Sequence, residues 1–188
     1  MLRRALLPIL ATSLMLALGV AAGDNRHRQV RLFAELIPIN EVPSISSGAH
    51  GRFKATLDRE NQTISYELSY DGLEDVALQA HIHFGQRHTA GGVSVFLCGN
   101  PPTVPPATFP QPPACPLSPA TITGTLTAAN IVGPAAQGIA PSQGGVNEFD
   151  ELADAILSGD TYANVHSAKF PGGEIRGQLR TDERHGRH

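Results

Sequence analysis

Residues 51–70 read GRFKATLDRENQTISYELSY, and this stretch decides the fold class. Two segments in it, 51–57 and 63–70, alternate apolar and polar side chains with a period of two, which is typical of half-buried β-strands. The residues between them are polar and suit the tip of a hairpin. The stretch therefore predicts two antiparallel strands that each direct one face toward a core.

Further strands are predicted on both sides of this hairpin. The same period recurs in six other segments: 30–37, the C-terminal part of 73–84, 92–97, 121–126, 161–168 and 174–179. The last two form a second hairpin around the turn 170–173. About eight short strands separated by turns rich in glycine and proline predict an all-β sandwich or barrel.

One segment departs from the period of two. Its apolar residues follow the spacing of an amphipathic helix: Phe149, Leu152, Ala153, Ile156 and Leu157. Asn147 is placed to cap the start of this helix, and Gly159 is placed just past its end. We expect this one short helix in a long connection between two strands, covering one end of the sandwich.

The N-terminal segment predicts export. Arg3 and Arg4 precede an apolar run over residues 6–18, and the small residues 20–23 then lead into a polar stretch. This order is that of a secretory signal peptide, and the apolar run is short for a membrane span, which needs about 20 residues.

Cleavage is expected after Ala22 or Gly23, and an uncleaved N-terminal anchor is the alternative. We therefore assign residues 1–23 to a signal peptide, 24–180 to one β-sandwich domain and 181–188 to a polar tail. This organisation predicts a secreted or periplasmic protein.

The charge of the chain argues against one class of partner. Removal of the predicted signal takes away two of the 14 basic residues and no acidic residue, which leaves 12 basic against 17 acidic residues and a formal charge of −5. A negative chain without a basic cluster does not suit a phosphate backbone. We expect no nucleic-acid partner and no membrane span after signal removal.

The two cysteines, Cys98 and Cys115, flank a segment rich in proline. Export to an oxidising compartment makes a disulfide the expected state of this pair. Closing a loop of this length would stabilise the fold by roughly 3 kcal/mol. A thiolate metal site is the alternative, but the spacing matches no common zinc pattern.

His81 and His83 lie two residues apart in a predicted strand. Their side chains therefore project from one face, roughly 6.5–7 Å apart, and can lean toward one ion because each metal–nitrogen bond is about 2 Å long. Ala80, Ile82 and Phe84 take the opposite face and are apolar. The histidine pair is therefore predicted to point away from the core.

His166 lies on the corresponding face of another predicted strand, together with Tyr162 and Asn164. If the two strands are neighbours, three imidazoles converge, which is a recognised arrangement for zinc or copper. His88, in the turn that follows His83, is either a fourth ligand or a loop histidine. The simpler alternative is that the His-x-His motif only decorates the surface.

Several stretches together resemble the CHRD domain, a module named after chordin and found in many exported bacterial proteins. They are residues 40–43 (NEVP), 63–66 (TISY), 80–85 (AHIHFG), 91–93 (GGV), 162–167 (YANVHS) and 171–179 (PGGEIRGQL). The resemblance spans about residues 30–179. It implies an immunoglobulin-like or superoxide-dismutase-like Greek-key sandwich and carries no settled activity.

The chain is also similar, more loosely, to Cu/Zn superoxide dismutase. That resemblance implies that His81, His83 and His166 are copper ligands and that Arg176 guides an anion. A structural ion pair with Glu174 is the alternative role for this arginine. The bridging histidine and the zinc-binding cluster of that family have no counterpart in the sequence.

Three functions follow, in order of preference. The first is an exported module that binds a metal ion without being an enzyme; the affinity order of divalent metals favours copper, and zinc is the second choice. The next is a metal-free module that recognises an extracellular protein or a cell-surface component. The last is a redox enzyme acting on superoxide, an anion that a negative chain does not attract.

Overall fold

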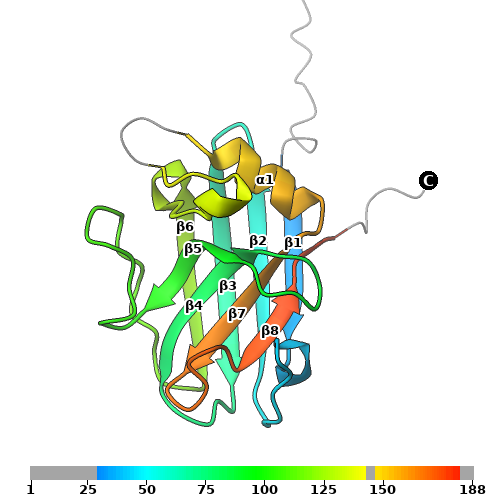
Figure 1. The fold of residues 1–188 in the computed structure, drawn as a ribbon, viewed down its shortest axis with the longest axis vertical. Helices are drawn as coiled ribbons and strands as arrows, with labels where there is room; N and C mark the ends of the chain where they lie inside the picture. Colours follow the sequence, from blue (N-terminus) through cyan, green and yellow to red (C-terminus); the bar gives the residue numbers. More distant parts are fainter. Residues whose placement is uncertain (1–28, 143–146, 183–188) are drawn as a thin grey trace, which may run out of the picture.

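The computed structural model describes residues 29–142 and 147–182. It confirms the predicted all-β sandwich, in which two antiparallel sheets pack face to face with one short helix (Figure 1). The predicted signal peptide lies outside the described residues, as does the predicted tail from residue 183 onward.

Nine strands lie in the described part of the chain. They are β1 (Gln29–Leu36), β2 (His50–Asp58), β3 (Thr63–Asp71), β4 (Ala77–Phe84), β5 (Gly92–Gly99), β6 (Ala120–Thr127), β7 (Thr161–Ser167), β8 (Ile175–Gln178) and β9 (Arg180–Thr181). One sheet has the order β6-β3-β2-β1-β9, and the other has the order β5-β4-β7-β8. The four-stranded sheet lies in front in Figure 1.

The hairpin predicted over residues 51–70 is β2–β3, paired from Asp58 with Thr63 to His50 with Asp71. The other predicted strands are present as well. The short strand β9 is an addition, because Thr181 pairs with Leu32 of β1 although the sequence placed it in the tail.

The core lies between the two sheets, because alternate apolar side chains of each strand turn inward. Phe53 and Leu68 of the five-stranded sheet and Ile82 of β4 are fully buried there. Ala80 is also buried in this core and Phe84 packs against it, which confirms the predicted core face of β4.

Helix α1 (Phe149–Leu157) lies between β6 and β7 in the chain and crosses one end of the sandwich in Figure 1, as predicted. The N-cap residue is Glu148, which makes no side-chain capping hydrogen bond, so the predicted cap is one residue off. Asn147 precedes it, and its Oδ1 accepts a hydrogen bond from the Phe149 N–H at 3.1 Å. Gly159 follows the helix with a φ of 80°, a left-handed conformation that glycine adopts at low cost.

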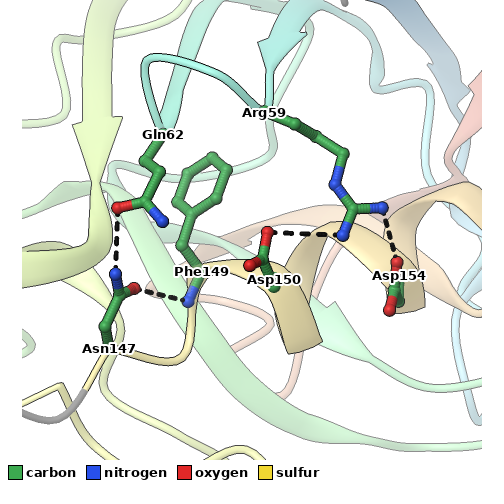
Figure 2. A network of polar contacts seen from close by, with 6 residues as sticks. All are labelled: Arg59, Gln62, Asn147, Phe149, Asp150 and Asp154. Carbon is green, nitrogen blue, oxygen red and sulfur yellow. Dashed lines mark hydrogen bonds and ion pairs between the residues drawn. The ribbon is translucent and has the colours of Figure 1, made fainter.

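The helix is also tied to the turn between β2 and β3 (Figure 2). Arg59 of that turn forms ion pairs with Asp150 at 3.3 Å and Asp154 at 2.7 Å. Asn147 Nδ2 donates to Gln62 Oε1 at 2.9 Å. These contacts fix α1 over the ends of the strands.

The predicted disulfide joins Cys98 and Cys115, which is consistent with an extracytoplasmic location. Asn100 fastens the same loop, since its Nδ2 donates to the carbonyls of Ala77 and Cys115 at 2.9 and 3.0 Å. Among the described residues, no helix is long and apolar enough to span a membrane.

Candidate metal centre

The three histidines of the predicted site come together because β4 pairs with β7. In this antiparallel register His83 lies opposite Tyr162, His81 lies opposite Asn164, and His166 lies two pairs further along, opposite Gln79. Each histidine offers one ring nitrogen, and these atoms lie within 4.8 Å of one another. The two strands are neighbours, so the convergence that was predicted on this condition is confirmed.

The histidines are buried, although they lie on the non-core face of the sheet. The exposed fractions of His81, His83 and His166 are 2%, 7% and 6%. The backbone atoms that bond two of these rings belong to the turn after β4 and to the turn between β7 and β8. The three histidines are thus enclosed by the fold and are not a surface decoration.

Two backbone carbonyls orient two of the rings. His83 Nδ1 lies 3.0 Å from the Gly91 oxygen, and His166 Nδ1 lies 2.9 Å from the Pro171 oxygen. Because a carbonyl accepts only, neutral His166 carries its proton on Nδ1 and keeps a lone pair on Nε2. Neutral His83 has one proton for two acceptors, the Gly91 oxygen beside Nδ1 and Asn164 Oδ1 beside Nε2, and with the proton on Nδ1 its Nε2 keeps the lone pair. Metal-binding histidines are commonly fixed in this way by an outer hydrogen bond.

His81 supplies the third nitrogen. Its Nδ1 lies 3.2 Å from His166 Nε2, while its own Nε2 is buried without a hydrogen-bond partner among the described residues. The ring packs edge-on against Phe96, with 4.4 Å between the centroids. A buried imidazole nitrogen without a partner costs free energy.

Burial keeps all three rings neutral. It lowers the pKa of His83 to about 4 and that of His81 well below the ordinary value, and the neighbouring imidazoles add to the effect at His81. Burial also lowers the pKa of His166. Neutral imidazole is the form that binds a metal ion.

Asn164 and Glu41 lie beside the site, and sequence reasoning assigned them no role in it. Asn164 Oδ1 is 3.1 Å from His83 Nε2, so its amide lies on the coordinating side of that ring. Glu41 is buried, it is hydrogen-bonded to Asn164, and burial raises its pKa to about 7 although the Arg176 charge opposes this. The carboxyl group is therefore largely protonated in mild acid.

Arg176 is buried under the turn that follows β4. Its guanidinium stacks on the Tyr162 ring at 3.4 Å, and Tyr162 in turn stacks on His83 with 4.7 Å between the ring centroids. Its Nη2 donates to the carbonyls of Gln86 and Thr89, both at 2.9 Å. Arg176 thus holds the covering turn, and its role as an anion guide stays a prediction.

The remaining assigned residue, His88, is exposed in the same turn, where its φ is 64°. It is not part of the three-histidine group found among the described residues. Within the part of the chain that the structure describes, Arg176 forms no ion pair with Glu174, the alternative role considered for it. Glu174 Oε1 instead accepts from the Glu74 N–H at 3.0 Å.

The lowered histidine pKa values predict an acid-sensitive fold in the metal-free protein. An unfolded chain protonates its histidines near pH 6.5, whereas folded His83 stays neutral to about pH 4. The unfolded state then binds more protons, so the free energy of unfolding falls as the pH drops from about 6.5 toward 4. Urea titrations of the chelator-treated protein at a series of pH values measure this slope.

Glu41 has the opposite effect, because its raised pKa lets the folded state bind the extra proton between pH 4.5 and about 7. At pH 6.5 the three histidines of the unfolded chain are still about half protonated and outweigh one carboxyl group, so the free energy of unfolding is expected to rise up to about pH 7 and to level off there. Glu41→Gln should make this rise steeper, because the folded variant no longer binds the extra proton. A metal-free protein whose stability is constant from pH 4 to 6.5 contradicts the prediction.

Comparison with known families identifies the domain. The family model of the CHRD domain matches residues 32–179, which includes all three histidines, both cysteines and Arg176. Searches of the curated proteins and of the solved structures returned no match.

Proposed function

This chain belongs to the CHRD-domain family, and we propose that it works as a module that binds one metal ion through His81, His83 and His166. The observation that carries the proposal is the convergence of three buried imidazoles, two of which have their outer nitrogen bonded to a backbone carbonyl. This arrangement prepares nitrogen lone pairs for an ion before any ion arrives.

The spacing of the nitrogens fits a shared ion after a small adjustment. Metal–nitrogen bonds of about 2 Å place ligand nitrogens roughly 3–4 Å apart. The His81–His166 pair is already at 3.2 Å, and the full group lies within 4.8 Å. The longest separation in the group must therefore shorten by about 1 Å for all three nitrogens to share one ion.

The donor set favours copper over zinc. All three donors are imidazole nitrogens, which suit both ions, and the affinity order of divalent metals places Cu²⁺ above Zn²⁺. The disulfide and the predicted signal peptide support a secreted or periplasmic location, where Cu²⁺ is the stable oxidation state of copper.

A binding role is preferred over catalysis because the histidines are nearly inaccessible, with exposed fractions of 7% or less. A superoxide-dismutase-like reaction needs an open coordination position that an anion can reach. The metal-free alternative, recognition of an extracellular protein or cell-surface component, is supported by the hydrogen bonds that already link His81 to His166 and His83 to Asn164.

Calorimetric titration of the purified protein with Cu²⁺ and with Zn²⁺ tests the proposal. We expect one ion per chain, tighter binding of Cu²⁺, and a stabilisation of about 2.7 kcal/mol at a free metal concentration 100-fold above Kd. Electron paramagnetic resonance of the copper form should show coupling to nitrogen. His81→Ala, His83→Ala and His166→Ala should each weaken binding at least 100-fold.

His50→Ala and His88→Ala are the matched controls, because both histidines are exposed and lie outside the group. The affinity of these two variants should stay within a few-fold of wild type. Unchanged affinity in the three site variants would refute the metal function and leave the metal-free binding module as the conclusion.

A further inference from the structure

Three of the four sheet edges are protected against pairing with another strand. β9 has two residues, and β8 has four and is bridged by Ile37. β5 is longer, but other segments cover it: Val132 N–H donates to the Ser94 oxygen at 2.9 Å, and Gly99 N–H donates to the Pro113 oxygen at 3.0 Å. Short or covered edges are the usual protection against unwanted association.

The fourth edge, β6, has none of these protections. It has eight residues, pairs with β3 along its whole length without a bulge, and contains neither a charged residue nor proline. Within the described ranges, residues 121–126 make no backbone hydrogen bond except to β3. A long, regular, uncharged edge presents free N–H and C=O groups to a second strand.

In an antiparallel strand, the backbone N–H and C=O groups of successive residues point alternately toward one neighbouring strand and toward the other side. This alternation shows which groups of β6 point away from β3. The Thr127 N–H donates to Asn130 Oδ1 at 2.9 Å and therefore points away from β3. Residues two apart in a strand point the same way, so Thr121, Thr123 and Thr125 also direct their N–H and C=O groups outward.

The register across the sheet gives the same result. The Asp182 N–H donates to the Arg31 oxygen at 2.9 Å, so the backbone N–H and C=O of Arg31 point away from its β2 partner, Thr56. The backbone groups of Thr56 therefore bond Ser65 on β3. Those of Ser65 in turn point away from its β6 partner, Thr125. The backbone groups of Thr125 consequently face outward.

The sequence of this edge is complementary to itself. Residues 121–127 read TITGTLT, with Gly124 at the centre. We propose that β6 pairs with β6 of a second copy, antiparallel about Gly124, so that the two five-stranded sheets join into one continuous sheet. The partner of this surface is thus another molecule of the same chain.

In this register Thr123 lies opposite Thr125 of the second copy, and their outward groups form about four backbone hydrogen bonds around the two-fold axis. Ile122 lies opposite Leu126 on the core side. Threonine pairs on the exposed face and aliphatic pairs below them are favourable cross-strand contacts. A register shifted by two residues would instead place Ile122 opposite Gly124.

The two-fold axis brings no like charges together, because the strand is uncharged. Gly124 is required at the axis by the fold itself, since a Cβ atom there would lie 2.6 Å from Tyr66 Oη. Its lack of a side chain also lets the two strands approach closely at a narrow, non-hydrogen-bonded pair.

Sedimentation velocity of the purified protein over a range of concentrations tests the proposal. The wild-type chain should dimerise reversibly. Thr123→Lys combined with Thr125→Lys places like charges opposite each other across the axis and should shift the dimer to monomer. Thr123→Lys combined with Thr125→Glu places opposite charges there and should keep the dimer. Ser65→Lys, on the same exposed face one strand inward, is the control and should dimerise as wild type does.

Hydrogen exchange locates the contact and covers the case of a variant that folds poorly. The amides of Thr123 and Thr125 should exchange at least ten-fold more slowly at high than at low protein concentration, while amides in the β2–β3 turn should not change. A wild-type chain that stays monomeric at about 1 mM, or a dimer without this protection, overturns the proposal.

Discussion

Gly91→Ala is expected to lower metal affinity 10- to 100-fold and to destabilise the fold by about 2–4 kcal/mol. A Cβ atom at this position would overlap the Phe84 carbonyl and lie 2.8 Å from Gly85 Cα, so the turn must move. The Gly91 oxygen accepts from His83 Nδ1, and the Gly91 N–H donates to Tyr162 Oη at 3.3 Å. Movement of the turn therefore frees the His83 ring.

Copper titration and urea unfolding measure the two effects. Gly172→Ala is a matched control, because nothing lies within 4 Å of a Cβ atom at that position, which is in the other turn near the site. The control should retain wild-type affinity and stability. Equal metal affinity in the Gly91→Ala variant and the control would show that the carbonyl of Gly91 does not orient His83.

Removal of the disulfide, through Cys98→Ser combined with Cys115→Ser, should cost about 3 kcal/mol of stability. The cysteines are 17 residues apart, so the unfolded variant gains the freedom of a loop of that size. For a domain of this length the loss corresponds to a fall in Tm of roughly 6–12 °C. Thermal unfolding of the two proteins measures the difference.

The same experiment has an internal control. A reducing agent should lower the Tm of the wild-type protein by a similar amount and leave the double variant unchanged. The Asn100 amide still bonds the Ala77 and Cys115 carbonyls in the variant, so the loop keeps part of its native path. A variant as stable as wild type would show that the disulfide adds nothing to this anchor.

Local periodicity was sufficient to predict the strands and the faces on which the histidines lie. Alternation placed His81 and His83 on one face of β4 and Ala80 and Ile82 on the other, and these positions are confirmed. The helix was predictable for the same reason, since Asn147 and the apolar residues that follow it mark its start in the sequence. Both features depend on residues close together in the chain.

Burial of the site was not predictable in this way. The carbonyls of Gly91 and Pro171 bond the rings, and a backbone carbonyl has no signature in the sequence. The only signal in the sequence was the glycines at and beside these positions, which indicate tight turns. Arg176 shows the same limit: its position in β8 was predicted, but its contacts with Gln86 and Thr89 depend on how a distant turn folds back.

The separation of the histidines along the chain also determines when the site can exist. His81 and His166 are 85 residues apart and meet only through the pairing of β4 with β7. A nascent chain that has not yet produced β7 holds at most the His81–His83 pair, a weak ligand set. If the proposed function is correct, an ion can bind all three histidines only after β4 has paired with β7, so it is taken from the compartment in which the chain completes its fold.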